Sequence, residues 1–549
     1  MSFVGVVVMR GRLLRHCSQL LVTALAGSAA GCGLLLGLDE FRDAPVSEST
    51  GAGGDNATCE PGEAVSCYEG PAETRGIGIC QDGEAACSDD GEASEECQGQ
   101  VMPAPETCAD TRDEDCDGSD CILWANTFGD ISDQTATELT IDRDGNIIIA
   151  GSFRGTLAFD AERPISANGT DVYLAKFDPT GKSLWSKQFG DSGYVDIQGI
   201  AADGSGSIII TGEIDSPLDF GGTVIRPGGN RSIFLVKFTP DGEPTWGASI
   251  DNGDSTESAK VAANTSGDIA VLGKGICTPC ESGFTSQLWL AKYRHDGSLG
   301  WTKKFMESEV GGQEAAGHRT TGGVAFDPFG NILITGSFVG TERFSVTTLT
   351  SAGGSDVFIA KFDSEGGYVW GNRYGGRWDQ HGTGIKSDSF GNVAVIGTYS
   401  GDISFGSSDD ALTSAGGEDI FVAKFSSAGA HLWSRSFGAS GDQRGSAIAV
   451  DKLNKILFTG STTGAVNFGG GPLSSGGGFD FPLVKLDEDG SHIWSKAFGD
   501  DQDQFGLAVA TSSSAEVLCT AAVKGAVNAG VGDLPNGGGT DVFLGKFAP

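Results

Sequence analysis

Five aspartates in an acidic, cysteine-rich stretch offer the clearest metal-binding chemistry in the sequence. They are Asp110, Asp113, Asp115, Asp117 and Asp120, and Gly118 lies among them at a turn. Carboxylates at this alternating spacing are hard oxygen ligands of the kind that Ca²⁺ binds, roughly six to eight at a time. A solvated acidic loop held by the neighbouring cysteines explains the same residues without a metal. We expect a calcium site or such a loop, with another metal as the third alternative.

The same stretch, residues 59–121, also holds eight cysteines. These are Cys59, Cys67, Cys80, Cys87, Cys97, Cys108, Cys116 and Cys121. In an exported chain an even set favours four disulfides, because the segment has too few apolar residues to fold by burial alone. The spacing leaves their connectivity open, and the lack of histidine disfavours a Zn²⁺ site. Cys277 and Cys280, in CTPC, favour a loop disulfide over redox chemistry, since no βαβ pattern surrounds them.

Signatures of common enzymes are absent from the sequence. It contains no HExxH motif and no GxSxG nucleophile elbow, and the triplet Gly181-Lys182-Ser183 lacks the upstream glycine of a phosphate-binding loop. The formal net charge of −37 makes nucleic acid and anionic lipid poor partners on electrostatic grounds. Divalent cations and basic surfaces suit this charge better, although acidity that only maintains solubility is an equal alternative.

An internal repeat organises the chain beyond residue 121. Tryptophan recurs at positions 124, 185, 246, 301, 370, 433 and 494. Lysine recurs at positions 176, 237, 292, 361, 424, 485 and 546, in segments such as DVYLAKF and DVFIAKF. Glycine recurs at positions 151, 212, 273, 336, 397 and 460, in segments such as IIIAGS and ILITGS. Three independent markers at matching spacings indicate seven copies of one structural unit.

Each copy contains four short runs rich in β-branched and aromatic residues, which is the chemistry of strands. In the first full copy they are residues 137–142, 146–153, 171–177 and 183–189. Turns such as DRDGN and DPTGK separate them, and their Asp-Gly pairs supply the positive φ of tight hairpins. Four-stranded antiparallel units in tandem indicate a β-propeller.

The ends of the repeat region predict how the ring closes. The region opens with a lone fourth strand, Ile122 to Phe128, and ends after a third strand, Asp541 to Phe547. Seven whole units result only if these two strands share one sheet, which also removes open edges. We therefore predict an all-β chain, a seven-bladed β-propeller of four-stranded antiparallel blades over residues 122–549, preceded by a small disulfide-rich segment.

Acidic and histidine residues gather at one predicted end of that ring. In a propeller, the loops from a fourth strand to the next first strand surround one end of the central channel, together with the loops that join second and third strands. The candidate ligand-face residues are Asp196, His318, Asp379, His381, Asp442 and Asp503. Their recurrence favours capping of backbone N–H groups at the turns. A carboxylate ring that holds a cation or a basic ligand is the alternative.

The stretch AKFDPTGKSLWSKQFGDSGYVDIQGIAADGSGSIIITGE resembles the bacterial SBBP-type β-propeller repeat, with an AKxDxxGxxxW element followed by FG, an Asp and a strand that ends in TG. The resemblance covers residues 122–549 and implies a surface or secreted scaffold with no assigned chemistry. Copies three and seven depart from the pattern, at LAVLGKGICTPCESG and at Ala521. We expect those two blades to be irregular.

Two further resemblances bear on function. CEPGEAVSCYEGPAETRGIGICQDGEAAC and ETCADTRDEDCDGSDC resemble the putative metal-binding motif of MopE-type bacterial surface proteins. DPTGKSLW and DEDGSHIW resemble the turn-and-Trp element of pyrroloquinoline-quinone dehydrogenase propellers, which implies a quinoprotein as one enzymatic alternative. No cofactor pocket or paired cysteine ring of that family is recognisable, so we expect the repeated Trp to pack between blades.

The N-terminus has the layout of an export signal. Arg10, Arg12 and Arg15 precede an apolar run from Leu20 to Ala30, and Ala29-Ala30-Gly31-Cys32 resembles a lipobox. We predict a lipoprotein signal over residues 1–31, lipidation of Cys32, a flexible tether over 32–58 and the cysteine-rich module over 59–121. Cleavage by ordinary signal peptidase, with free secretion, stays open.

These observations favour an exported, lipid-anchored propeller that is not an enzyme. It would serve adhesion, envelope assembly or ligand capture at the cell envelope, with the outer membrane favoured because Gly33 stands where an Asp often signals inner-membrane retention. The expected partners are the membrane, through the anchor, and an unidentified protein or glycan, and not nucleic acid. The alternative is an envelope hydrolase or quinoprotein with its site at the channel mouth.

Overall fold

The computed structural model describes residues 59–90, 96–104, 113, 116, 121–190, 193–251, 255–280, 283–305, 320–344, 347–406, 411–529 and 532–549. Apart from one turn of 3₁₀ helix, Ala72–Thr74, the regular structure within these ranges is β-strand. None of the helical structure described there is long and apolar enough to cross a membrane. The predicted anchor, Cys32, the signal and the tether lie outside the described residues.

Seven four-stranded antiparallel sheets make up the repeat region. In blade order, innermost strand first, blades one to three contain β4 (Glu138–Ile141), β5 (Ile147–Leu157), β6 (Ile165–Phe177) and β7 (Ser183–Phe189); β8 (Val195–Ala202), β9 (Ile208–Ile214), β12 (Ser232–Phe238) and β13 (Pro244–Ile250); β14 (Ser255–Ala263), β15 (Ile269–Cys280), β16 (Gly283–Tyr293) and β17 (Leu299–Phe305). Blades four to seven contain β18 (Thr320–Phe326), β19 (Ile332–Phe338), β22 (Asp356–Phe362) and β23 (Tyr368–Tyr374); β24 (Gln380–Ser387), β25 (Val393–Tyr399), β28 (Asp419–Phe425) and β29 (His431–Phe437); β30 (Gln443–Val450), β31 (Ile456–Thr462), β34 (Phe481–Leu486) and β35 (His492–Phe498); β36 (Gln504–Thr511), β37 (Val517–Val523), β40 (Asp541–Phe547) and β3 (Ile122–Phe128).

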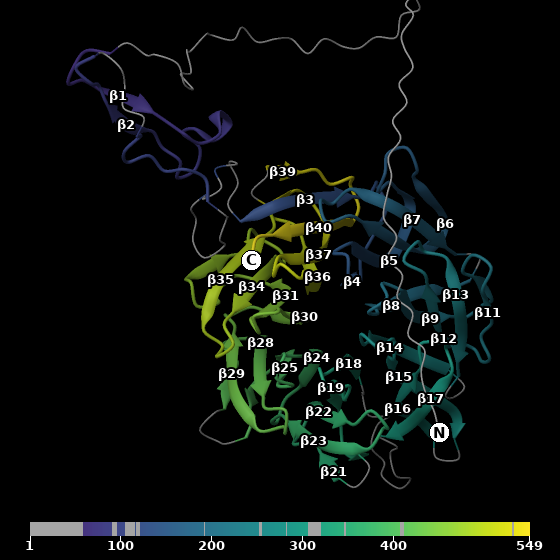
Figure 1. The fold of residues 1–549 in the computed structure, drawn as a ribbon. Helices are drawn as coiled ribbons and strands as arrows, with labels where there is room; N and C mark the ends of the chain where they lie inside the picture. Colours follow the sequence, from purple (N-terminus) through teal and green to yellow (C-terminus); the bar gives the residue numbers. More distant parts are fainter. Residues whose placement is uncertain are drawn as a thin grey trace, which may run out of the picture. The chain divides into compact units, whose positions relative to one another are not determined.

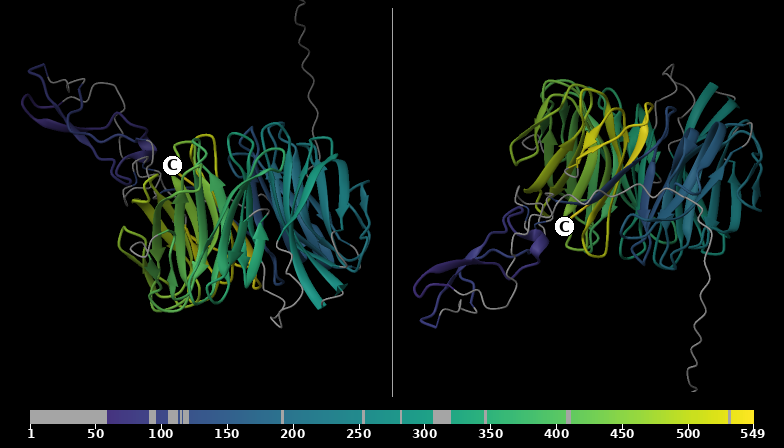
Figure 2. Two further views of the ribbon diagram at one scale, coloured as in Figure 1. Left: turned by 90° about the horizontal axis from the view of Figure 1, so that it is seen from below. Right: turned by 90° about the horizontal axis from the view of Figure 1, so that it is seen from above.

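The seven blades form a closed ring. Each innermost strand contacts the innermost strand of the next blade, in the order β4, β8, β14, β18, β24, β30, β36 and back to β4 (Figure 1). Seen from the side, the sheets stand next to one another and their connecting loops collect at the two ends of the ring (Figure 2). The chain is therefore a seven-bladed β-propeller, as the repeat predicts.

The seventh blade joins the two ends of the repeat region. Strand β3 pairs antiparallel with β40, so that Trp124 lies opposite Lys546 and Phe128 lies opposite Val542. Just outside the pair, the N–H of Ala548 donates to the carbonyl of Cys121 at 2.9 Å. The predicted closure is confirmed, and it leaves no unpaired edge between the first and last strands of the ring.

Asp-Gly turns define the strand ends, and blade five illustrates why. Asp388 Oδ1 accepts the N–H groups of Phe390 and Asn392, at 3.0 and 2.8 Å, which folds the turn between β24 and β25. Gly391 completes the turn at φ +80°, a backbone conformation that residues with a Cβ rarely adopt. The aspartate is fully buried, so its second oxygen needs a partner of its own.

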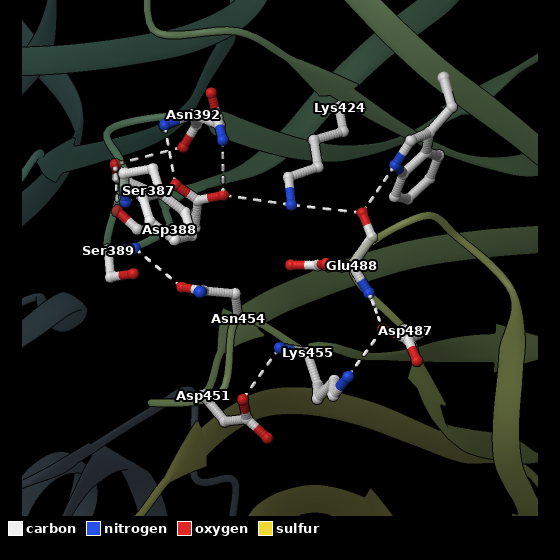
Figure 3. A network of polar contacts seen from close by, with 12 residues as sticks. Ser387, Asp388, Ser389, Asn392, Lys424, Asp451, Asn454, Lys455, Asp487 and Glu488 are labelled. Carbon is white, nitrogen blue, oxygen red and sulfur yellow. Dashed lines mark hydrogen bonds and ion pairs between the residues drawn. The ribbon is translucent and has the colours of Figure 1, made fainter.

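The partners of that oxygen are the side-chain amide of Asn392, which donates at 2.9 Å, and the repeated lysine. Lys424 Nζ lies 3.1 Å from Asp388 Oδ2, and the lysine and aspartate side chains are 6% and 2% exposed (Figure 3). The same Nζ donates to the carbonyl of Glu488 in blade six at 3.2 Å. Trp433 Nε1 donates to that carbonyl at 2.9 Å. A fixed lysine and tryptophan thus tie the inner turn of one blade to the outer turn of the next.

The Lys–Trp latch, a lysine and a tryptophan on one carbonyl of the next blade, recurs around the ring. Complete examples are Lys546 and Trp124 on Pro179, Lys237 and Trp246 on His295, Lys292 and Trp301 on Ser364, and Lys361 and Trp370 on Ser427. The indole also covers the turn glycine of the next blade: a Cβ on Gly490 would lie 2.9 Å from Trp433. The repeated Trp packs between blades, as expected.

Blade six lacks the complete latch because blade seven has no turn between its third and fourth strands. Trp494 is 2% exposed, and its Nε1 has no hydrogen-bond partner. The side chain lies instead in a core with Cys121, Ile122 and Ala548, where the two ends of the chain meet. Closure by the termini therefore leaves one buried donor unsatisfied.

Five blades carry an extra hairpin between their second and third strands. These are β10 (Leu218–Asp219) with β11 (Val224–Ile225), β20 (Thr341–Phe344) with β21 (Thr347–Thr350), β26 (Asp402–Ile403) with β27 (Leu412–Thr413), β32 (Ala465–Asn467) with β33 (Pro472–Ser474), and β38 (Val527–Asn528) with β39 (Asp533–Leu534). In blades one and three the second and third strands, β5 with β6 and β15 with β16, extend into one long hairpin instead. Blade seven, where we expect irregularity, pairs its first two strands with the same register shift as blades two, four, five and six, so that expectation is wrong.

The cysteine-rich module contains one hairpin, β1 (Ala64–Cys67) with β2 (Gly83–Ala86), and is held by disulfides. The bonds are Cys59–Cys87, Cys67–Cys97 and Cys80–Cys116. Cys121 is also disulfide-bonded, and Cys108 lies outside the described residues. The side chains of Cys277 and Cys280 are not described, and Cys519 is a buried free thiol. The structure thus supplies the connectivity of three disulfides that spacing alone left open.

Candidate functional site

One end of the ring carries most of the residues expected at a ligand face. We call it the loop face: the loops between second and third strands, together with the loops from a fourth strand to the next first strand. Asp379, Asp442 and Asp503 lie at the ends of these second loops, directly before β24, β30 and β36. His318 falls outside the described residues.

The three aspartates join neighbouring loops. Asp379 Oδ1 accepts the N–H of Ser355 at 2.8 Å. Asp442 and Asp503 accept the N–H groups of Glu418 and Phe479 in the same way, at 3.2 and 3.1 Å. Each carboxylate therefore holds the loop of the preceding blade against the entry to the next one, a structural contact that explains its recurrence.

His381 lies among buried serines. Its Nδ1 is 2.9 Å from Ser337 Oγ, and its Nε2 is 3.4 Å from Ser355 Oγ, which is 3.1 Å from Asp379 Oδ1. A Ser, His and Asp in contact invite comparison with nucleophilic catalysis. However, Ser337 and Ser355 are 0% and 2% exposed, so neither hydroxyl can reach a substrate. This cluster organises the loops around blade five.

Asp196 lies in a different polar cluster, on β8. Burial raises its pKa, and the charge of Glu213 adds to the effect, while a hydrogen bond from Gln198 opposes it. Gln198 Nε2 donates to Glu213 Oε1 at 2.8 Å, and Arg231 pairs with Glu213 at 3.2 Å. The Arg231 guanidinium also lies 4.3 Å from the centre of the Tyr194 ring. These contacts hold together the ends of the blade-two strands at the loop face.

A charged pair spans the inner wall of the ring. Lys260 Nζ on β14 donates to Glu138 Oε1 on β4 at 2.6 Å. Blade two lies between these strands, and at the matching position of β8 it has Gly199, which has no side chain. The protein around Lys386 on β24 desolvates its ammonium group and lowers its pKa, although the side chain is exposed. The charge of Glu138 opposes this shift, and the charge of Lys260 adds to it. Charged side chains thus meet at the centre of the propeller.

A hollow of the loop face lies between blades five and six. It has a volume of about 530 Å³. Its lining residues are Trp378, Ser400, Gly401, Ser414, Gly416, Gly417, Glu418, Asp442 and Arg444. The lining is polar except for one indole, and three of its nine residues are glycines without side chains. Of the residues predicted from sequence, Asp442 is the one that lines this hollow.

Trp378 was missed because it does not belong to the repeat. It lies in the loop before β24, and Ser132, Gly193 and Gly441 occupy the equivalent place before other first strands. Its side chain is 57% exposed, whereas the repeated Trp494 is 2% exposed. The sequence feature that identifies it is a tryptophan in a loop, outside the regular spacing of the seven repeated tryptophans. Because binding residues are found mainly on loops, an exposed indole in this loop is a candidate ligand contact.

The predicted metal ligands lie mostly outside the described residues. Asp113 is described, and its carbonyl accepts the N–H of Ile79 at 3.1 Å. Asp110, Asp115, Asp117 and Asp120 are not described. Within the part of the chain that the structure covers, no group of three or more His, Cys, Asp or Glu side chains could hold a metal. Calcium binding stays a prediction from the sequence.

A comparison with known protein families identifies the repeat in one place. Residues 184–219 match the SBBP beta-propeller repeat. The matched stretch runs from β7 through β8 and β9 to β10, so it covers the junction between blades one and two. The other blades follow the same strand order as this SBBP copy.

A curated relative is the uncharacterized WD repeat-containing protein L264 of Acanthamoeba polyphaga mimivirus, 25% identical over 432 residues. The match covers 63% of this chain and 31% of the relative, so the chain spans less than a third of the relative's length.

Similar solved structures include a protein of unknown function from Dyadobacter fermentans (10% identity, TM-score 0.36, 78% of this chain and 98% of that one). The Neurospora crassa Pan2 WD40 domain (9%, 0.38, 76% and 90%) and the polysaccharide lyase Uly1 (10%, 0.40, 78% and 99%) are also similar.

Proposed function

We propose that this protein is an exported, lipid-anchored propeller that binds a ligand on its loop face without transforming it. The observation that carries the proposal is the hollow around Trp378, where an exposed indole stands beside Glu418, Asp442 and Arg444. A concave site with one aromatic surface and a few converging polar groups has the properties of a binding pocket.

The site's chemistry favours binding over catalysis. Glu418 Oε2 lies 2.5 Å from Arg444 Nε, so the carboxylate is engaged by a guanidinium and is poorly suited to act as a base. The serines near His381 are buried, as described above. The proposed role is adhesion, envelope assembly or ligand capture, and the expected ligand is a glycan or a protein.

The proposed location rests on the N-terminal sequence. Lipidation at Cys32 would hold the propeller at the envelope through a tether, and the disulfides of the cysteine-rich module suit an oxidising compartment. Mass spectrometry of the mature N-terminus tests the anchor: a diacylated Cys32 supports it, and a cleaved, unmodified terminus overturns it.

Calcium binding by the acidic end of the module is proposed on residue type and spacing alone. EDTA should then increase proteolysis within residues 59–121. If the cleavage pattern is the same with EDTA and with added Ca²⁺, this role is lost.

Glycan and protein arrays probed with the purified protein test the binding function. We expect a retained ligand whose signal falls when Trp378 is replaced by alanine, while hydrolase screens and cofactor absorbance stay negative. Turnover of a substrate, or ligand binding that Trp378→Ala leaves unchanged, would overturn the proposal.

A further inference from the structure

Trp378 presents a flat apolar surface that the fold holds in place. The indole packs on Gly401, where a Cβ would lie 2.0 Å from Trp378 Cδ1, and Gly401 has φ +65°. The Arg377 guanidinium lies 5.6 Å from the centre of the ring. A side chain fixed before binding loses little entropy when a ligand stacks on it.

Three other side chains of the lining carry donors and acceptors whose charges nearly cancel. Arg444 lies between two carboxylates, with Nε 2.5 Å from Glu418 Oε2 and Nη2 3.7 Å from Asp442 Oδ2. These side chains are between 30% and 51% exposed, so each keeps hydrogen-bonding capacity for a ligand. With Arg377 nearby, two cations face two anions. A ligand of either charge would gain little from this balance.

The chemistry of the hollow therefore selects a ligand with one apolar face and a rim of hydroxyl groups. A pyranose ring has this property: its C–H face stacks on an indole, and its hydroxyls both donate to carboxylates and accept from guanidinium. Gly416 and Gly417 add no side chains to the lining, and the volume of about 530 Å³ is in the range of small-molecule sites. An apolar ligand would find one apolar side chain in the lining.

We infer that the hollow between blades five and six binds a neutral saccharide, with Trp378 as the stacking surface and Glu418, Asp442 and Arg444 as the groups that bind its hydroxyls. This inference rests on the proposed binding function and gives its ligand class. Asp442 also holds the Glu418 loop, so Trp378 is the residue whose replacement separates binding from folding.

The test titrates the purified protein with cellohexaose, maltohexaose, mannohexaose and galactan oligosaccharides by calorimetry, with oligogalacturonate and chitosan oligomers as charged comparators. At least one neutral saccharide should bind. Trp378→Ala should weaken that binding about tenfold, and Trp378→Phe should retain most of it, because stacking needs an aromatic ring. Phe390→Ala is the matched control, since Phe390 is a similarly exposed aromatic (64%) on the turn between β24 and β25.

Three outcomes overturn the inference: no neutral saccharide binds, binding is confined to the charged oligomers, or Trp378→Ala binds as the unchanged protein does. A protein ligand found on arrays whose binding depends on Trp378, without any saccharide binding, would keep the proposed function and reject this ligand class. Equal melting temperatures for the unchanged protein and for Trp378→Ala would exclude misfolding as the cause of a loss.

Discussion

Trp433 and Lys424 donate to one and the same backbone oxygen, the carbonyl of Glu488 in the next blade. A carbonyl has two lone pairs, and here both are taken by side chains from the preceding sheet. Since the same two residue types recur in every copy, this oxygen marks where successive blades are joined. The interface between blades is thus specified by hydrogen bonds as well as by apolar packing.

Replacement of Trp433 by Phe should destabilise the protein more than the same change at Trp494. The first variant loses a 2.9 Å hydrogen bond to Glu488, which contributes about 1 kcal/mol. The second variant removes the buried Nε1 of Trp494, which has no partner, and with it the free-energy cost of burying an N–H group without a hydrogen bond. Urea unfolding of the two variants measures the difference. Equal losses would contradict the latch.

Lys424→Met should cost about 3 kcal/mol, because it leaves the carboxylate of Asp388 buried without its cation. The matched control is Lys455→Met, whose partner Asp487 is 36% exposed. There the loss should stay below about 1 kcal/mol. Chemical denaturation measures the free energy of unfolding of both variants. A similar cost for both would show that burial of the Lys424 pair has no energetic consequence.

Asp480→Asn should change the pH dependence of stability. The carboxyl is 2% exposed, and burial, helped by the charge of Asp500, raises its pKa to about 6. Because the folded protein holds this proton more tightly than the unfolded chain does, stability should fall as pH rises from about 4 to about 6 and then level off. The stability of the asparagine variant should not decline over this pH range. At neutral pH its free energy of unfolding should exceed that of the unchanged protein by at most about 3 kcal/mol.

The geometry around Asp480 supports the gain. Oδ1 of Asp480 has no hydrogen-bond partner, and it faces Gln504 Oε1: both oxygens lie within 2.4 Å of the place where a Cβ on Gly499 would be. An asparagine amide can donate where a carboxylate cannot. Asp487→Asn is the control with the opposite sign, since Lys455 lowers the pKa of Asp487. Unfolding free energies across this pH range test both variants, and parallel curves for Asp480→Asn and the unchanged protein would exclude the effect.

Removal of residues 541–549 should unfold or aggregate the protein, because it exposes the edges of β37 and β3. A circular permutant that moves residues 122–129 behind residue 549 should stay monomeric with a similar melting temperature. A short linker suffices, since Ala548 and Cys121 already share a hydrogen bond. Gel filtration and thermal melting distinguish the two, and a monomeric, normally melting truncated chain would refute the role of the clasp.

The sequence predicted the blades and their closure because each strand repeats with its turns. Strand β7, Ser183–Phe189, has the expected limits, whereas β6 begins at Ile165 and not at residue 171, since it extends into a hairpin with β5. The partner of the repeated lysine was not identified. The lysine at the Lys424 position occurs in every copy, and the aspartate at the Asp388 position occurs in five of the seven, with Asn264 and Ser512 in the other two. Their contact depends on a turn that lies far away in the sequence.

The loop face was harder to predict. Asp379 and Asp442 were found from their recurrence, which reflects a structural role, and Trp378 was missed because it occurs once. A repeat reveals what all blades share. Residues that bind a ligand at one pair of blades differ from the repeated pattern, so the repeat does not reveal them.

The pairing of β3 with β40 also sets an order of events in synthesis. β3, the first propeller strand to leave the ribosome, must wait for β40, the last strand, before it finds a neighbour. A chain that ends before β40 therefore keeps a vacant place in its seventh blade that no other part of it fills.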